Sequence, residues 1–141
     1  MAELLLLFRI VLAMILGGIL GWQRQQRGKW AGIRTYALVS GGSALFTVLS
    51  VVSFSSDTAR IAAGVVTGIG FLGAGTILHK ENRVEGLTTA AGLWMIAAVG
   101  MAVGLQLYIL ASVSSLLALL IFILDDKKIS FKNNSDKNED D

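Results

Sequence analysis

One uncharged stretch decides the fold: Gly86–Leu124, GLTTAAGLWMIAAVGMAVGLQLYILASVSSLLALLIFIL, contains no charged residue. A membrane-spanning helix needs about 20 consecutive apolar residues, and this stretch is about twice that length. We therefore predict two spans, joined by a tight turn near Gly104–Gln106, where a glycine and a polar side chain coincide.

Three further apolar runs precede this stretch, and each is long enough for one span. We predict an all-α integral membrane protein, a bundle of five transmembrane helices over residues 1–124, with spans at about 4–22, 35–56, 61–78, 86–103 and 107–124. Residues 125–141 are a polar tail with too few apolar side chains to fold alone, so we expect this tail to be disordered and cytoplasmic.

The composition agrees with burial in lipid. Hydrophobic residues make up 54% of the chain and charged residues 16%, against about 25% charged residues in soluble domains. A net charge of +2 without a basic face argues against nucleic-acid binding. The chain has no Cys, which excludes disulfides and thiolate metal sites, and no nucleophile–base pair can be assembled. We expect neither an enzyme nor a bound cofactor.

Basic residues set the expected orientation. Ten of the twelve Lys and Arg residues fall in the first loop, the third loop and the tail, which five spans place on one side: Arg24, Arg27, Lys29, Arg34, Lys80, Arg83, Lys127, Lys128, Lys132 and Lys137. The positive-inside rule then predicts an outside N-terminus and a cytoplasmic C-terminus. Tyr36, with Trp22 and Trp30, is expected at the inner headgroup level.

The third run is rich in glycine, and two interpretations stay open. Its glycines are Gly64, Gly68, Gly70, Gly73 and Gly75. In one interpretation they form a G-x-x-x-G face on which another helix packs closely. In the other they break the helix, and freed carbonyls line a constriction that holds an ion. The formal G-x-G-x-x-G match is not a dinucleotide fingerprint, because it lies inside a membrane run.

The second run carries four hydroxyl side chains on one helical face: Ser40, Ser43, Thr47 and Ser50. They either line a wet path or bond helix carbonyls, as such groups often do.

Charges near the outer side suggest a vestibule. Arg9 is the one charge clearly within a span, and it either pairs with Asp57 or extends to the outer headgroups. Arg60 lies beside Asp57 in sequence. Mg²⁺ prefers oxygen ligands, yet no carboxylate lies mid-membrane, so a cation site would need a ring of Asp57 in a homo-oligomer or carbonyls of the glycine stretch.

Several sequence blocks resemble the MgtC/SapB family of bacterial inner-membrane proteins. They are Gly21–Arg24, Ala31–Thr35, Asp57–Ala63, Gly68–Gly75 and Gly86–Ala91 followed by Leu93 and Trp94. The resemblance implies a multi-pass plasma-membrane protein in short form, without the cytoplasmic domain of longer members. Its motif polar residues are here Arg24, Arg34, Thr35, Thr88 and Thr89. Gln23 stands where members often carry an acid.

The resemblance implies a role in magnesium homeostasis, and two hypotheses follow. In the first, the chain is a component linked to Mg²⁺ transport, with Asp57, Arg9 and Arg60 as the outer vestibule and residues 64–75 as the constriction. In the second, it is a regulator that does not transport and binds a membrane ATPase or ATP synthase through its helices. We expect a homo-oligomer in the lipid bilayer, held by the glycine faces.

Overall fold

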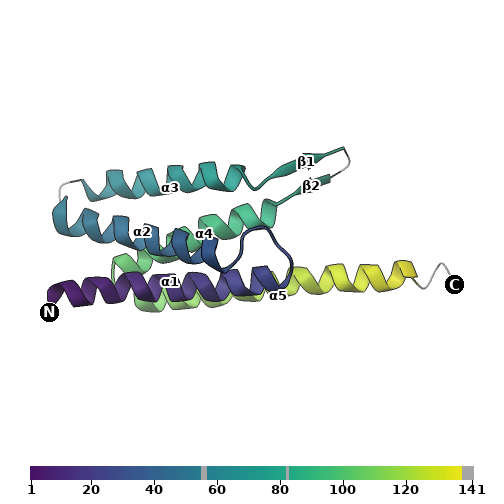
Figure 1. Ribbon diagram of the computed structural model, residues 1–141, viewed down its shortest axis with the longest axis horizontal. Helices are drawn as coiled ribbons and strands as arrows, with labels where there is room; N and C mark the ends of the chain where they lie inside the picture. Colours follow the sequence, from purple (N-terminus) through teal and green to yellow (C-terminus); the bar gives the residue numbers. More distant parts are fainter. Residues whose placement is uncertain (55–56, 82, 138–141) are drawn as a thin grey trace.

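The computed structural model describes residues 1–54, 57–81 and 83–137. This part of the chain forms five helices and one β-hairpin: α1 (Ala2–Gln26), α2 (Ile33–Ser53), α3 (Thr58–Ala74), β1 (Leu78–Lys80), β2 (Arg83–Glu85), α4 (Leu87–Gly104) and α5 (Tyr108–Lys137). The helices run alongside one another in a single elongated bundle (Figure 1). The prediction of a helical fold with five helices is confirmed.

The connections sort to the two ends of the bundle (Figure 1). We call the end that carries Met1, the α2–α3 connection and the α4–α5 turn the N-terminal end. The other end carries the α1–α2 loop, the hairpin and the last part of α5, and we call it the basic end. The three basic segments of the sequence therefore lie at one end of the bundle.

The core lies where α1, α2 and α4 meet, and α5 covers one side of it. Tyr36, Leu93, Ile96 and Val103 are fully or almost fully buried there. The outer surface is also apolar, because large hydrophobic side chains along α1 and α5 are exposed. Apolar residues on both the inside and the outside are typical of a bundle solvated by lipid.

Close helix packing depends on glycine pairs in α1 and α4. A Cβ at Gly17 would overlap the Tyr36 carbonyl, and one at Gly21 would overlap Gly32 and Ile33. Likewise, a Cβ at Gly100 or Gly104 would overlap the backbone or side chains of α2. Both pairs have the G-x-x-x-G spacing, which lets two helix backbones approach closely.

Three helices are long and apolar enough to cross a bilayer by length and composition: α1, α2 and α4. The apolar part of α5, Tyr108–Leu124, and α3 are shorter. These findings are consistent with a membrane protein.

The turn between α4 and α5 lies where the sequence predicted it. Leu105 caps the C-terminal end of α4, with its N–H donating to the Met101 carbonyl, and the Leu107 N–H donates to the Ala102 carbonyl at 2.9 Å. Gln106 takes a positive φ of 66°, a left-handed conformation that reverses the chain. The long apolar run is therefore divided by a helix-terminating turn rather than by a charge.

Two boundaries differ from the sequence prediction. The third span was expected over 61–78, but α3 ends at Ala74, where Thr76 Oγ1 donates to the Gly73 carbonyl at 2.8 Å, and the chain then turns into the hairpin. At the other end of the chain, α5 continues as a helix to Lys137, into the tail for which no fold was expected. A helix already nucleated by packed residues extends at little further cost per residue. Residues 138–141 lie outside the described part.

Candidate functional site

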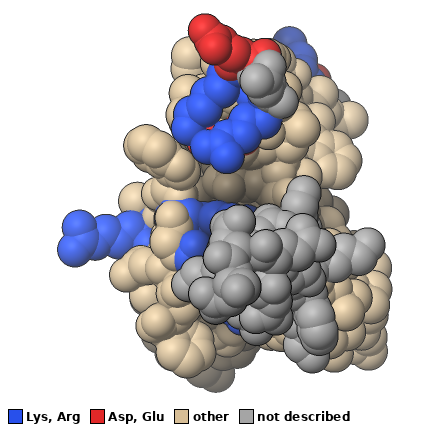
Figure 2. Space-filling model, turned by 90° about the vertical axis from the view of Figure 1, so that its right-hand side faces the viewer, with Lys and Arg blue, Asp and Glu red and all other residues tan. Residues whose placement is uncertain are grey.

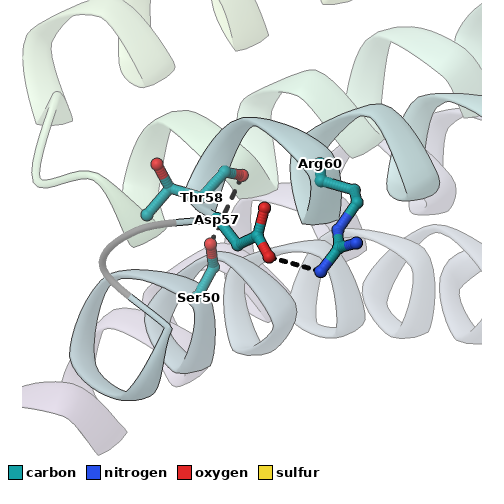
Figure 3. Close-up of polar contacts among 4 residues, drawn as sticks. All are labelled: Ser50, Asp57, Thr58 and Arg60. Atoms are coloured by element: carbon teal, nitrogen blue, oxygen red, sulfur yellow. Dashed lines mark hydrogen bonds and ion pairs between the residues drawn. The ribbon is translucent and has the colours of Figure 1, made fainter.

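Asp57 and Arg60 form an ion pair at the N-terminal end of the bundle. Asp57 directly precedes α3, so Arg60 lies one turn along, and its Nη2 donates to Asp57 Oδ2 (Figure 3). Both side chains are substantially exposed, at 46% for Asp57 and 80% for Arg60. Ser50 Oγ donates to the Thr58 carbonyl at 3.4 Å and ties the end of α2 to the start of α3. The carboxylate is thus placed at the surface with a cation already bound to it.

Arg9 binds the end of α4 rather than Asp57. Its Nη1 donates to the Gly104 carbonyl at 3.3 Å. With the Gln106 amide oriented to satisfy both groups, the amide oxygen accepts from Arg9 Nη1 at 3.3 Å and Nη2 at 2.8 Å. A guanidinium is favoured at a helix C-terminus, where carbonyls lack partners and the helix dipole is negative. The hypothesis of an Arg9–Asp57 pair is therefore wrong for this structure.

The glycine-rich stretch forms one continuous helix. α3 runs without a break from Thr58 to Ala74, so the constriction made by freed carbonyls is not formed. Gly73 packs near Ala90 of α4, and Gly75 follows the last helical residue. A Cβ at Gly64, Gly68 or Gly70 would meet no atom within 4 Å. The G-x-x-x-G face of α3 is therefore open, not packed against another helix of the described chain.

This open face borders an apolar groove between α2 and α3, which we call the α2–α3 groove. Its volume is about 760 Å³. The lining comes from both helices: Leu38, Val39, Gly42, Ser43 and Phe46 of α2 and Ile61, Gly64, Val65, Gly68, Ile69 and Leu72 of α3. Within α3, the described buried residues are Ile69 and Gly73. The helix is thus attached along one edge, and most of its surface faces outward.

The hydroxyl face of α2 packs against α4 and does not form an open path. Thr47 Oγ1 donates to the Ser43 carbonyl of its own helix at 2.8 Å. Cβ atoms built at Gly100 and Gly104 would come close to Ser40, Ser43 and Thr47. Of the two interpretations given for these hydroxyls, packing against neighbouring helices is the one observed, with carbonyl bonds for Thr47 and Ser50 and a Ser40 hydroxyl that is buried without a partner.

The five motif polar residues occupy three helix ends at the basic end. Arg34 and Thr35 are exposed in the first turn of α2, and Thr88 is half-buried at the start of α4. Thr89 is buried, at 4% exposed. Arg24, in the last turn of α1, is the most deeply buried of the five at 1% exposed. Sequence reasoning placed Arg24 in a basic loop and missed this burial.

A compact aromatic arrangement surrounds Arg24. Its Cζ lies 4.4 Å from the centre of the Phe122 ring, and Tyr36 meets the same ring edge-on with centroids 6.4 Å apart. Tyr36 is fully buried, whereas the sequence predicted it at the headgroup level. Gly92 of α4 makes room, because a Cβ there would overlap Tyr36 Oη and Phe122 Cζ. Four helices therefore meet around one guanidinium. Its partner on α5 lies too far along the chain for local patterns to indicate the contact.

The hairpin carries its own ion pairs at the basic end. β1 and β2 are antiparallel, with Lys80 opposite Arg83 and Leu78 opposite Glu85. Glu85 accepts from Lys80 Nζ at 3.0 Å and from Arg83 Nη2 at 2.8 Å. The Lys80 hydrogen bond is the largest effect on the pKa of Glu85 and, with the charges of Arg83, Lys80 and Lys29, holds it below its usual value against the opposing effect of burial. Figure 2 shows the Lys and Arg side chains that gather on this end.

Among the residues that the structure describes, no three His, Cys, Asp or Glu side chains come together as a metal site. Asp57, Arg60 and Arg9 all lie towards the N-terminal end, but their polar contacts are separate: one ion pair and one helix cap.

Comparisons with known proteins agree on one family. The model of the MgtC family matches residues 10–129. "Putative magnesium transporter YhiD" of Escherichia coli K12 is 45% identical over 124 residues, covering 82% of this chain and 58% of the relative. "Protein MgtC" of Salmonella typhimurium LT2 is 42% identical over 128 residues, covering 88% and 55%. "Protein SrpB" of Synechococcus elongatus is 42% identical over 128 residues, covering 80% and 70%.

The chain thus spans little more than half the length of the first two relatives. No solved structure matches it. The family match covers most of the residues, includes every sequence block that carried the resemblance, and extends from α1 into α5. This chain belongs to the MgtC family.

Proposed function

We propose that this chain is a multi-pass protein of the bacterial inner membrane that takes part in magnesium homeostasis. Support comes from the family and from the name of the E. coli relative, which this chain matches over 82% of its length. The chain spans 58% of the length of that relative.

We further propose that all five helices cross the bilayer, with the N-terminus outside and the C-terminus in the cytoplasm. The apolar parts of α3 and α5 are 17 residues long, at the lower limit for a spanning helix. Met1 and the C-terminal end of α5 lie at opposite ends of the bundle, as an odd number of crossings requires (Figure 1). The concentration of Lys and Arg at the basic end favours a cytoplasmic position for that end.

The open glycine face of α3 carries our proposal for how the protein acts. The G-x-x-x-G pairs of α1 and α4 are filled by α2, whereas Gly64 and Gly68 of α3 border the empty α2–α3 groove. In a bilayer, small residues of this kind favour helix association, because they let backbones approach. We propose that a helix binds in this groove. The occupant that we propose is α3 of a second copy of the chain, since identical faces can pair about a two-fold axis.

In this proposal the protein serves magnesium homeostasis through helix association, and a helix of a membrane ATPase is the other candidate occupant. The competing proposal is transport of Mg²⁺ itself, which the name of the E. coli relative favours. For that role Asp57 is the best oxygen ligand near the outer surface, but Arg60 already occupies its carboxylate. A transport role would require this ion pair to open in an oligomer.

Mg²⁺ flux into liposomes that contain only this protein separates the two proposals. We expect no flux above that of empty liposomes at equal reconstitution. A flux that saturates with Mg²⁺ and is lower in the Asp57→Asn variant would show that helix association is not sufficient to explain the function. It would support the proposal that the protein transports Mg²⁺.

Cysteine cross-linking tests the occupant, because the chain has no Cys of its own. Gly68→Cys places a thiol on the groove face, and Gly70→Cys places one about 200° around α3 as a matched control. Both positions are open, so neither variant should disturb the fold. We expect rapid disulfide-linked dimers in membranes from Gly68→Cys and few from Gly70→Cys. Equal dimer yields would refute pairing through this face, and a cross-link to an ATPase subunit would identify the other occupant.

A further inference from the structure

The structure contains a charged side chain that is buried without the partners such a group requires. Arg24 is 1% exposed, and its Nε and Nη1 are both buried without a hydrogen-bond partner. The guanidinium keeps its charge at any ordinary pH, so it cannot adapt to burial by losing a proton. The face of the Phe122 ring at 4.4 Å supplies a cation–π contact, but a ring face accepts no conventional hydrogen bond from the N–H groups at the edge of the guanidinium.

A second unpartnered donor lies beside it. Tyr36 Oη is buried without a partner, and its ring meets the edge of the same Phe122 ring. Ser40, one helical turn further along α2, also has a buried hydroxyl without a partner. Buried polar groups are nearly always hydrogen-bonded, so a group of unpartnered hydrogen-bond donors from two helices indicates a missing acceptor.

The acidic side chains that the structure describes do not supply this acceptor. Asp57 binds Arg60 towards the opposite end of the bundle, and Glu85 binds Lys80 and Arg83 in the hairpin. Glu3 and Glu81 are both exposed, one in the first turn of α1 and the other in the hairpin turn. An acceptor for Arg24 must therefore come from outside these residues.

The position of Arg24 favours an anion that arrives from the basic end. The residue lies in the last turn of α1, and the loop that follows folds back on it, with the Arg27 and Lys29 N–H groups donating to the Arg24 carbonyl. Lys29 and Arg34 add positive charge on the same loop and on the first turn of α2. A concentration of positive charge raises the local concentration of anions.

We propose that Arg24 and Tyr36 form a binding site for a phosphate-type oxyanion, with Phe122 as the platform that positions the guanidinium. A fully ionised phosphate group offers hydrogen-bond acceptors and no donors. It therefore matches a guanidinium and a phenol, which both donate. The group comes from the headgroup of an anionic phospholipid or from free phosphate in the cytoplasm. This site is independent of the α2–α3 groove and of the proposed role in magnesium homeostasis.

The test measures ligand-dependent thermal stability of the full chain in detergent, at ionic strength held constant with chloride. One arm adds inorganic phosphate, and the other adds short-chain phosphatidylglycerol with short-chain diacylglycerol as the phosphate-free control. We expect a saturable rise in melting temperature in one arm. Response to phosphate assigns the free anion as ligand, and response to phosphatidylglycerol assigns the lipid headgroup.

Two variants and one matched control locate the site. Arg24→Gln should weaken the apparent affinity by about tenfold or more, because it removes a charge-assisted interaction. Tyr36→Phe removes one oxygen and should weaken the affinity by about threefold to tenfold. Arg60→Gln removes an exposed arginine charge at the opposite end of the bundle and should leave the affinity within about twofold. If Arg24→Gln does not fold, Tyr36→Phe still decides, because it keeps the ring in place.

Three outcomes would overturn the proposal. The first is no saturable stabilisation by either ligand. The second is equal stabilisation of wild type, Arg24→Gln and Tyr36→Phe, which would mean that the anion binds elsewhere. The third is a result from the double variant Asp125→Asn/Asp126→Asn. If it loses as much stability as Arg24→Gln, and if combining it with Arg24→Gln causes no further loss, then the tail of the chain is the partner of Arg24.

Discussion

The position of Arg9 is set by hydrogen bonds to residues far along the chain, which its neighbours in sequence do not reveal. A charge within a span must find a partner or reach the headgroups, and the sequence offered Asp57, an acid predicted on the same side of the membrane. The structure instead uses the unpaired carbonyls at the end of α4 and the amide of Gln106. Those acceptors are uncharged, so a search for opposite charges does not find them.

A double-mutant cycle measures this contact. Arg9→Gln should lower the free energy of unfolding in detergent by about 1.5–3 kcal/mol, the usual contribution of a hydrogen bond to a charged group. Combined with Gln106→Ala, the losses should be less than additive, because both changes break the same contact. Combined with Asp57→Asn, they should add, since Asp57 binds Arg60. Coupling to Asp57 and additivity with Gln106 would contradict the structure.

Glu85 gives the hairpin a pH dependence whose sign follows from its environment. Its pKa is lowered in the folded state, first by the Lys80 hydrogen bond, so the folded hairpin favours the ionised carboxylate. This contribution to hairpin stability is fully present above the ordinary value of 4.5 and is lost as the pH falls through the lowered folded pKa.

Hydrogen exchange of the hairpin amides, measured from about pH 6 down to about pH 3 and corrected for the intrinsic exchange rate, tests this pH dependence of hairpin stability. We expect protection of the amides of β1 and β2 to decline at the acidic end. Glu85→Gln should abolish the decline, and Glu81→Gln, in the exposed turn, should leave it unchanged. A decline that persists in Glu85→Gln would show that another group controls the hairpin.

At the scale of the element, the three helical G-x-x-x-G pairs have different environments. Gly17 and Gly21 of α1 and Gly100 and Gly104 of α4 approach α2, whereas Gly64 and Gly68 of α3 border the groove. The three pairs have the same spacing, so the sequence cannot rank them. Which pair is filled depends on which helices become neighbours, and this is decided by tertiary packing.

Leucine substitutions distinguish the filled pairs from the open one. Gly100→Leu must displace the Ser40 backbone and should destabilise the monomer by about 3 kcal/mol or more, as severe overpacking does. Gly68→Leu meets open space, so melting of the monomer should change little, while association through the groove should weaken. Equal losses of monomer stability would mean that α3 is packed within the chain after all.

The elements themselves were largely predictable, and their partners were not. Hydropathy located five helices, and the coincidence of Gly104 and Gln106 located the turn that the positive φ of Gln106 makes. The burial of Arg24 was not predictable, because a basic residue next to a basic loop normally stays in water. Its contact with Phe122 joins the first helix to the last, and no local pattern carries such information.

At the scale of the whole molecule, the arrangement of loops predicts accessibility from the two sides of the membrane. Cysteines introduced one at a time into this cysteine-free chain report it. Ser53→Cys, at the exposed end of α2, should react with a membrane-impermeant maleimide in intact spheroplasts. His79→Cys, in the exposed hairpin, should react only after the membrane is permeabilised. The reverse pattern would invert the proposed orientation, and labelling of both in intact spheroplasts would contradict five crossings.

The Arg9 contact also constrains how the chain is inserted into the membrane during synthesis. In the proposed five-span topology Arg9 enters the membrane with the first helix, but its acceptor at Gly104 is 95 residues further along the chain. During synthesis the guanidinium must therefore remain near the outer headgroups, or be held by the insertion machinery, until α4 has been threaded. A nascent chain stalled before α4 would leave this charge uncompensated in lipid. Ribosome-stalled intermediates that end in α3 should accordingly remain extractable, and those that include α4 should become stably inserted.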